Sequence, residues 1–172
     1  MSEANHRVLR DLAGSQDGRM KNHLELKQFA QIAIIVEDIE KAAREWAEIL
    51  GVPVPEIIEQ PKPEKPQPNL TYRGVPACYG LRLAVIEAPQ GFIIELHQCD
   101  ENDSTFREFV NKHGYGVHHL GFLTGEKRDA VVDEFCERGY ELRTVGMYED
   151  GSWTIIDSED TLGVNLNVKP HM

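Results

Sequence analysis

Two stretches of this chain contain the same succession of strand-like and helix-like segments. A β-branched run at residues 29–36 (FAQIAIIV) precedes an amphipathic helical stretch at 38–50, which Gly51 ends. The pattern restarts near residue 117, with a second helical stretch that Gly139 ends. Gly51 and Gly139 are 88 residues apart (139 − 51). The same shift places the first strand-like run of one stretch on that of the other, which indicates an internal repeat.

Strand-like segments follow each helical stretch. They lie near residues 53–59, 70–75, 81–88 and 91–98 in the first repeat, and near 140–147, 152–157 and 163–168 in the second. The last strands match at a shift of 70 residues, which places Glu95 on Asn165 and His97 on Asn167. The difference from 88 is accommodated around a proline-rich loop, residues 60–68 (QPKPEKPQP), which the second repeat lacks. We therefore expect an α+β protein in which two paired βαβββ modules form a cupped, barrel-like mixed sheet.

The repeat divides the chain into four parts. Residues 1–28 are polar and are expected to form a flexible N-terminal arm. Residues 29–98 are the first βαβββ module and residues 116–169 the second. Residues 99–115 are a linker containing a short helix capped by Ser104.

Composition excludes several classes of protein. The net charge of the 172 residues is −11, which argues against a nucleic acid or an acidic membrane surface as partner. Cys78, Cys99 and Cys136 are odd in number and form no CxxC pair, so neither a zinc knuckle nor a disulfide framework is predicted. No apolar stretch has the length of a bilayer span or the pattern of a signal peptide, so we expect a cytoplasmic protein.

Polar residues interrupt the apolar runs of the last strands. Glu95 and His97 follow Phe92–Ile94, and because alternate strand residues share a face they project together. A carboxylate on an inward face is costly unless it is paired or bound to a cation. The alternative is that this face is exposed to solvent. That alternative is weakened because the four equivalent positions of the repeat are all polar: Gln31, Glu95, His119 and Asn165.

Three segments resemble the vicinal oxygen chelate superfamily, which includes glyoxalase I, methylmalonyl-CoA epimerase, extradiol dioxygenases and bleomycin-resistance proteins. They are residues 106–122 (FREFVNKHGYGVHHLGF), 31–51 and 94–97 (IELH). The resemblance covers about residues 29–169 and is strongest to methylmalonyl-CoA epimerase and glyoxalase I.

The resemblance implies a divalent metal (Zn, Ni, Co, Mn or Fe) held by one residue from the first and one from the last strand of each module. Its positions in this chain are Gln31, Glu95, His119 and Asn165. The fourth position is normally Glu, and an amide there has no useful basicity. Glu95 and its neighbour His97 therefore remain as candidate catalytic residues, although His97 could also be a hydrogen-bonded or exposed histidine. Trp153 could either line the cup or fill the core.

The function implied by this set is that of a metal-dependent isomerase or lyase. It would transfer a proton beside the carbonyl of a small thioester or thiohemiacetal, as glyoxalase and epimerase members do. A non-catalytic small-molecule-binding protein of the bleomycin-resistance type is the alternative, and Asn165 favours it. An iron-dependent oxygenase using Glu95, His97 and His119 is a second alternative. Two modules suffice for a site within one chain, so both a monomer and a homodimer are compatible with the sequence.

Overall fold

The computed structural model describes residues 24, 26, 28–61, 67, 69–89, 91–147 and 152–171 of the chain. The expected N-terminal arm lies outside these residues, except for Leu24, Leu26 and Gln28. The first repeat comprises β1 (Gln28–Ile35), α2 (Ile39–Leu50), β2 (Ile57–Gln60), β5 (Leu81–Glu87) and β6 (Ile93–Cys99). The second comprises β7 (Gly116–Leu123), η2 (Gly125–Lys127), α4 (Arg128–Glu137), β8 (Glu141–Met147), β9 (Ser152–Asp157), α5 (Glu159–Leu162) and β10 (Asn165–Lys169). Between the repeats' strands lie β3 (Thr71–Tyr72), β4 (Val75–Pro76) and α3 (Thr105–His113).

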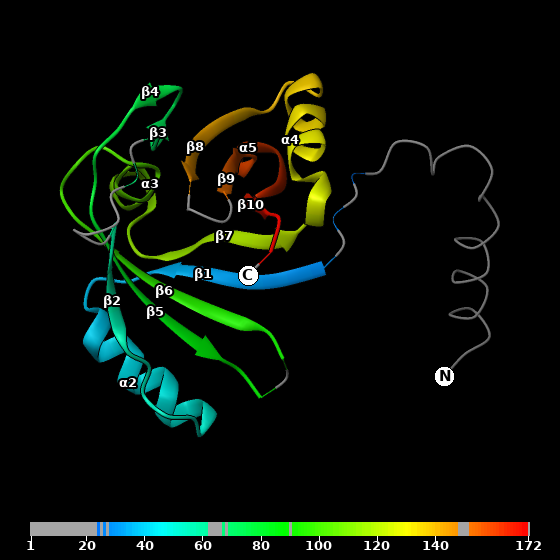
Figure 1. Cartoon of the computed structure of the whole chain (residues 1–172). Coiled ribbons are helices and arrows are strands. Elements are labelled where there is room, and N and C mark those ends of the chain that lie inside the picture. The colour runs from blue at the N-terminus through cyan, green and yellow to red at the C-terminus, as the bar shows by residue number, and fades with distance from the viewer. Residues whose placement is uncertain are drawn as a thin grey trace, which may run out of the picture.

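The described strands form one mixed sheet, in the order β2-β5-β6-β1-β7-β10-β9-β8-β3-β4. In each repeat the first strand pairs in parallel with the last, β1 with β6 and β7 with β10. The two halves join where β1 pairs antiparallel with β7. The sheet curls around the space between its halves, as Figure 1 shows. The expected α+β class and cupped mixed sheet are therefore confirmed.

Each half of the sheet packs its outer face against its own helix. Asp38 caps α2 by accepting a hydrogen bond from the backbone of Lys41, and Gly51 ends the helix in the left-handed conformation (φ 67°). The apolar side of α2 packs against β5 and β6, for example against Ala84 and Leu96. In the second half, α4 packs in the same way against β9 and β10 (Figure 1). Because the helices occupy the outer face, the alternate side chains of these strands face the inside of the curl.

One segment departs from the predicted arrangement. Residues 70–75, expected as a first-module strand, form the β3–β4 hairpin, and β3 pairs with β8 of the second half. The side chains of Tyr72 and Arg73 hold the hairpin on α3 through the carboxylate of Glu108, at 2.6 Å each. The chain between β2 and β5 thus crosses from one half of the sheet to the other, and Leu70 and Tyr79 beside the hairpin pack against Phe106 of α3.

None of the helices in the described part of the chain combines the length and apolar character that a membrane crossing requires.

Candidate functional site

The inner face of the curl has a cluster of buried polar side chains on its central strands. Gln31 (0% exposed) lies on β1, Glu95 (9%) and His97 (4%) on β6, and His119 (1%) on β7. Strand alternation places these groups inside, since the neighbours of Glu95 on β6, Ile94 and Leu96, face α2. Such deeply buried polar groups need partners.

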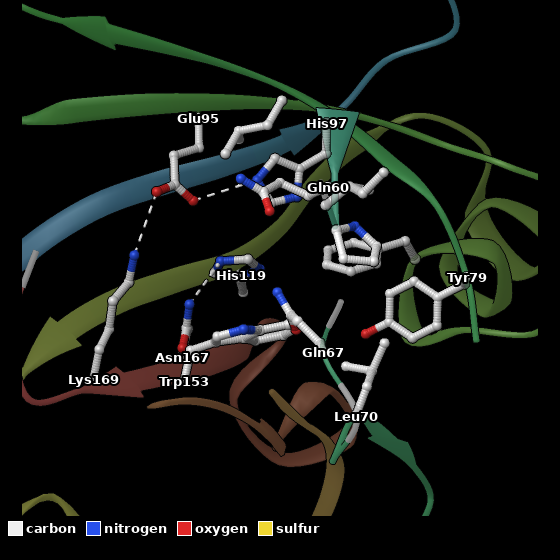
Figure 2. A pocket seen from close by; sticks show the side chains of 14 residues that line it. Gln60, Gln67, Leu70, Tyr79, Glu95, His97, His119, Trp153, Asn167 and Lys169 are labelled. Atoms are coloured by element: carbon white, nitrogen blue, oxygen red, sulfur yellow. Dashed lines mark hydrogen bonds and ion pairs between the residues drawn. The ribbon is translucent and has the colours of Figure 1, made fainter. Parts of the chain in front are cut away.

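The Gln31 amide is the centre of this cluster. Its Nε2 donates to Oε2 of Glu95 at 2.5 Å and lies 3.3 Å from Nε2 of His119. Nε2 of His97 lies 3.3 Å from the same oxygen of Glu95, on the wall of the cup shown in Figure 2. Three of the four expected ligand positions, together with His97, are therefore brought together.

β1 and β7 lie close together, and the Gln31 side chain fits between them only because residue 121 is glycine. Gly121 is the cross-strand partner of Gln31. A Cβ added to Gly121 would lie 2.2 Å from Cγ of Gln31, which no side chain can tolerate without displacement. Gly121 is thus a requirement of the site.

The strand register changes the equivalence expected for the fourth position. Gln31 pairs with Ile93 across β1 and β6, and its repeat equivalent His119 pairs with Asn165 across β7 and β10. The last strands therefore match at a shift of 72 (165 − 93) and not at the expected 70. The counterpart of Glu95 is consequently two residues beyond Asn165.

That counterpart is Asn167, whose Nδ2 lies 3.3 Å from Nε2 of His119 (Figure 2). Asn165 is also buried, but its amide donates to the backbone carbonyl of His118 at 3.3 Å and to Glu159 at 3.5 Å. The expectation that Asn165 joins the other three residues was wrong by two positions. Alternation along β10 identifies the right face, but the pairing register is needed to choose between the two asparagines.

Lys169, the last residue of β10, was not predicted as a site residue. Its Nζ lies 3.3 Å from Oε1 of Glu95, so it supplies a positive charge to the cup (Figure 2). At the corrected shift Lys169 is the counterpart of His97 (169 − 97 = 72). The available signal was alternation, because Lys169 follows Asn167 by two residues on the same face.

The electrostatics of the cup favour an ionised acid beside a neutral imidazole. Burial by itself raises the pKa of Glu95, but the hydrogen bond with His97 and the charge of Lys169 outweigh it and hold that pKa below 4.5. Burial, followed by the neighbouring His118, His97 and Lys169, lowers the pKa of His119 well below 6.5. At neutral pH the cup therefore has a carboxylate and a histidine able to use a lone pair.

A β-bulge modifies the strand that carries His119. Ala33 pairs with His119 and Ile34 with Val117, so His118 is an extra residue without a partner on β1. Simple alternation predicts that His118 faces away from the cup. Its ring packs against Phe106 and Phe109 of α3, and its Nδ1 also lies 2.9 Å from Nδ1 of His119.

A pocket of about 550 Å³, counting its open mouth, leads to this polar cluster. Its polar lining consists of Glu95, His97, His119, Asn167 and Lys169, together with Gln60 and Gln67 (Figure 2). Apolar and aromatic side chains flank these groups, with Leu83 beside His97 on the neighbouring strand; they are Leu70, Tyr79, Leu81, Leu83, Phe106 and Trp153. Trp153 thus lines the cup, and its ring lies against β8 where a Cβ on Gly146 would be 2.2 Å from Nε1.

The polar side chains of the cup include several donors of the kind that bind divalent cations. Among the described residues, no group of three or more His, Cys, Asp and Glu side chains is arranged to hold a metal. With the amides included, the set becomes Gln31, Glu95, His119 and Asn167. Both amide oxygens, Oε1 of Gln31 and Oδ1 of Asn167, are buried without a hydrogen-bond partner, and Glu95 is ionised. Oxygen and imidazole donors of this kind fit Zn, Ni, Co, Mn or Fe. In this structure both amides present their nitrogens to His119, so the residues are compatible with a metal once the amides turn their oxygens toward it.

The fold of this chain is similar to that of solved methylmalonyl-CoA epimerases. Methylmalonyl-CoA epimerase of Mycobacterium tuberculosis is 20% identical, with a TM-score of 0.59 over 90% of this chain and 94% of that one. A hypothetical protein of Bacillus halodurans is 18% identical, with a TM-score of 0.57 over 83% and 92%. A methylmalonyl-CoA epimerase variant of Streptomyces coelicolor, in complex with 2-nitronate-propionyl-CoA, is 19% identical, with a TM-score of 0.52 over 84% and 96%.

Sequence comparison gives the family. No curated protein matches the chain. The family model described as Glyoxalase/Bleomycin resistance protein/Dioxygenase superfamily matches residues 30–156, which is most of the chain and includes both first strands, both helices and Glu95. The chain therefore belongs to the glyoxalase/bleomycin resistance protein/dioxygenase superfamily.

Proposed function

We propose that this protein is a metal-dependent isomerase or lyase of the epimerase type, which moves a proton beside the carbonyl of a small thioester or thiohemiacetal. The observation that carries the proposal is the convergence of Glu95, His97 and His119 on one pocket, with the buried Gln31 in contact with Glu95 and His119. The epimerase fold of the neighbouring structures supports the same class of reaction.

Glu95 is the proposed base. It is ionised, it lines the pocket, and its two oxygens face different partners, Oε2 toward Gln31 and His97 and Oε1 toward Lys169. A carboxylate positioned in this way can take a proton from carbon beside a carbonyl. His97 shares Oε2 of Glu95 and is the proposed partner that passes the proton on.

The positive charge of Lys169 serves the same step. Its ammonium holds Glu95 in the charged form and lies where a substrate oxygen that gains negative charge would be stabilised. A metal would be held by Glu95 and His119 with the amide oxygens of Gln31 and Asn167. When bound, it supplies a Lewis acid that stabilises developing negative charge on the substrate carbonyl.

The apolar lining of the pocket indicates the kind of substrate that it can hold. Leu81, Leu83 and Trp153 line the pocket with Tyr79 and Phe106. A group packed there needs apolar surface, whereas the carbonyl must face Glu95. An acyl group with a hydrocarbon or aromatic portion fits both requirements better than a fully polar acid does.

Proton exchange from solvent deuterium into a panel of acyl-CoA thioesters and hemithioacetals tests the proposal. We expect exchange by the metal-supplemented protein and a loss of about 100-fold or more in Glu95→Gln, the magnitude of a lost general base. Glu87→Gln on the neighbouring β5 is the matched control, because Glu87 is an exposed acid. No exchange with any of Zn, Ni, Co, Mn or Fe would refute the catalytic role.

A non-catalytic binding protein is the second candidate, and Asn167 favours it. The place equivalent to Glu95 carries an amide, so the second module contributes no base. Elemental analysis of protein purified without added metal separates the candidates. Stoichiometric Zn, Ni, Co or Mn supports the isomerase or lyase, and Fe supports an oxygenase. Absence of metal, together with tight binding of a small apolar compound, supports the binding protein.

A further inference from the structure

His118, the extra residue in β7, connects the cup to the linker helix α3. The ring of His118 is fully buried and touches two polar partners on opposite sides. Its Nδ1 lies 2.9 Å from Nδ1 of His119, and its Nε2 lies 3.1 Å from Oγ1 of Thr105, the first residue of α3. Without the bulge, alternation would point neighbouring strand residues to opposite faces and the two rings could not meet in this way.

A hydrogen bond between the two rings needs one proton, which is bound to one of the two Nδ1 atoms. Each Nδ1 is either a donor or an acceptor, so a hydrogen bond between them requires that one ring has its proton on Nδ1 and the other does not. The direction of this bond therefore decides the tautomer of His119, and with it the role of the Nε2 that faces the cup.

The cup end of this chain of contacts fixes the direction, and the α3 end allows it. At the α3 end, Nε2 of His118 lies 3.1 Å from Oγ1 of Thr105, a hydroxyl that can either donate or accept. Nε2 of His118 can therefore donate to Thr105, which leaves Nδ1 of a neutral His118 ring as an acceptor.

At the cup end, the fixed acceptor is the carboxylate of Glu95. The Gln31 amide must present its nitrogen to Glu95, and the same nitrogen lies 3.3 Å from Nε2 of His119. Nε2 of His119 therefore faces a donor and must offer a lone pair. The cup end therefore requires that His119 carries its proton on Nδ1, so that Nδ1 of His118 accepts from it and Nε2 of His118 donates to Thr105.

We propose that His118 is a positioning residue that, through the chain Thr105–His118–His119, locks His119 in the Nδ1–H tautomer with its Nε2 lone pair directed into the cup. This inference rests on the proposed function for its purpose, because that lone pair is what a metal ion would use. Partners that orient a metal-binding histidine in this way typically contribute about 10- to 100-fold in metal affinity.

Nitrogen NMR of the metal-free full-length protein, labelled with ¹⁵N in histidine, tests the tautomer directly. We expect His119 to show a protonated Nδ1 and an unprotonated Nε2. In His118→Phe, which retains an aromatic ring against Phe106 and Phe109 but removes the acceptor, the Nε2–H form of His119 should become populated. In His118→Asn, whose amide oxygen can still accept from Nδ1, the wild-type pattern should be retained.

Zinc affinity, measured by competition with a chromophoric chelator, is the second readout. We expect a loss of about 10- to 100-fold in His118→Phe and a smaller change in His118→Asn. A protonated Nε2 on His119 in the wild type would overturn the inference, even if His118→Phe does not fold. If the tautomer pattern is as expected and no protein binds metal, the positioning role stands and the metal-dependent function fails.

Discussion

At the scale of single residues, the two repeats contribute different residues to the cup at equivalent positions. Glu95 and His97 on β6 correspond to Asn167 and Lys169 on β10. The cup therefore has one carboxylate, and an ammonium 3.3 Å away already balances its charge. A divalent ion would bind such a set less tightly than one with two carboxylates.

Asn167→Glu should therefore strengthen metal binding. The change places a second carboxylate beside His119, and a carboxylate is a stronger ligand than an amide for hard and borderline cations. We expect zinc or manganese affinity to rise by about tenfold or more, measured by calorimetry. Any exchange activity should rise as well, because a second base is added.

Asn165→Glu is the matched control for this prediction, since it places the same side chain two residues earlier on the same strand. Its carboxylate would lie next to Glu159, so it should destabilise the fold without tightening metal binding. Equal gains in affinity from both variants would contradict the assignment of Asn167 to the fourth position.

At the scale of elements, the order of strands and helices could be predicted from the sequence, but the register could not. Apolar periodicity and the stop signals at Gly51 and Gly139 are local, and the helices of both repeats are found where these signals place them. Pairing register depends on which backbone groups meet across strands. The sequence therefore did not separate Asn165 from Asn167. The bulge at His118 was missed for the same reason, because an extra strand residue leaves no compositional mark.

Gly121→Ala tests the close approach of β1 and β7. The new methyl group would overlap the Gln31 side chain, so we expect a loss of about 1–3 kcal/mol in the free energy of unfolding, measured with urea. Metal affinity should fall as well, since Gln31 is displaced. In the double variant Gln31→Ala/Gly121→Ala the overlap is removed, and most of the stability lost through Gly121→Ala should return. Strict additivity of the two changes would mean that the clash lies elsewhere.

At the scale of the whole molecule, an ionic cluster around Glu159 joins the linker helix to the second half of the sheet. Glu159 of α5 contacts Lys112 (2.7 Å) and His113 (2.6 Å) at the end of α3, and Arg143 of β8 (3.3 Å). The sequence contained no signal for this cluster, because its members lie on three elements far apart in the chain. It supports the cup indirectly, since α3 also carries Thr105.

The pH dependence of stability should report this cluster. Burial by itself raises the pKa of Glu159, but hydrogen bonds from Lys112 and His113 and the charge of Arg143 lower it from 4.5 to about 2. A lowered pKa in the folded state stabilises the fold above the unfolded value, and this contribution is lost as the pH falls from about 4.5 to about 2. Since Lys112 and His113 are partly exposed, we expect this contribution to the free energy of unfolding to be about 1–2 kcal/mol.

Urea unfolding as a function of pH measures this contribution. The stability of Glu159→Gln should differ from that of the wild type most above about pH 5 and progressively less toward pH 2. Asp160→Asn, which changes an exposed neighbour, should follow the wild type throughout. A difference between the wild type and Glu159→Gln that does not change with pH would show that the loss comes from packing and not from the charge of Glu159.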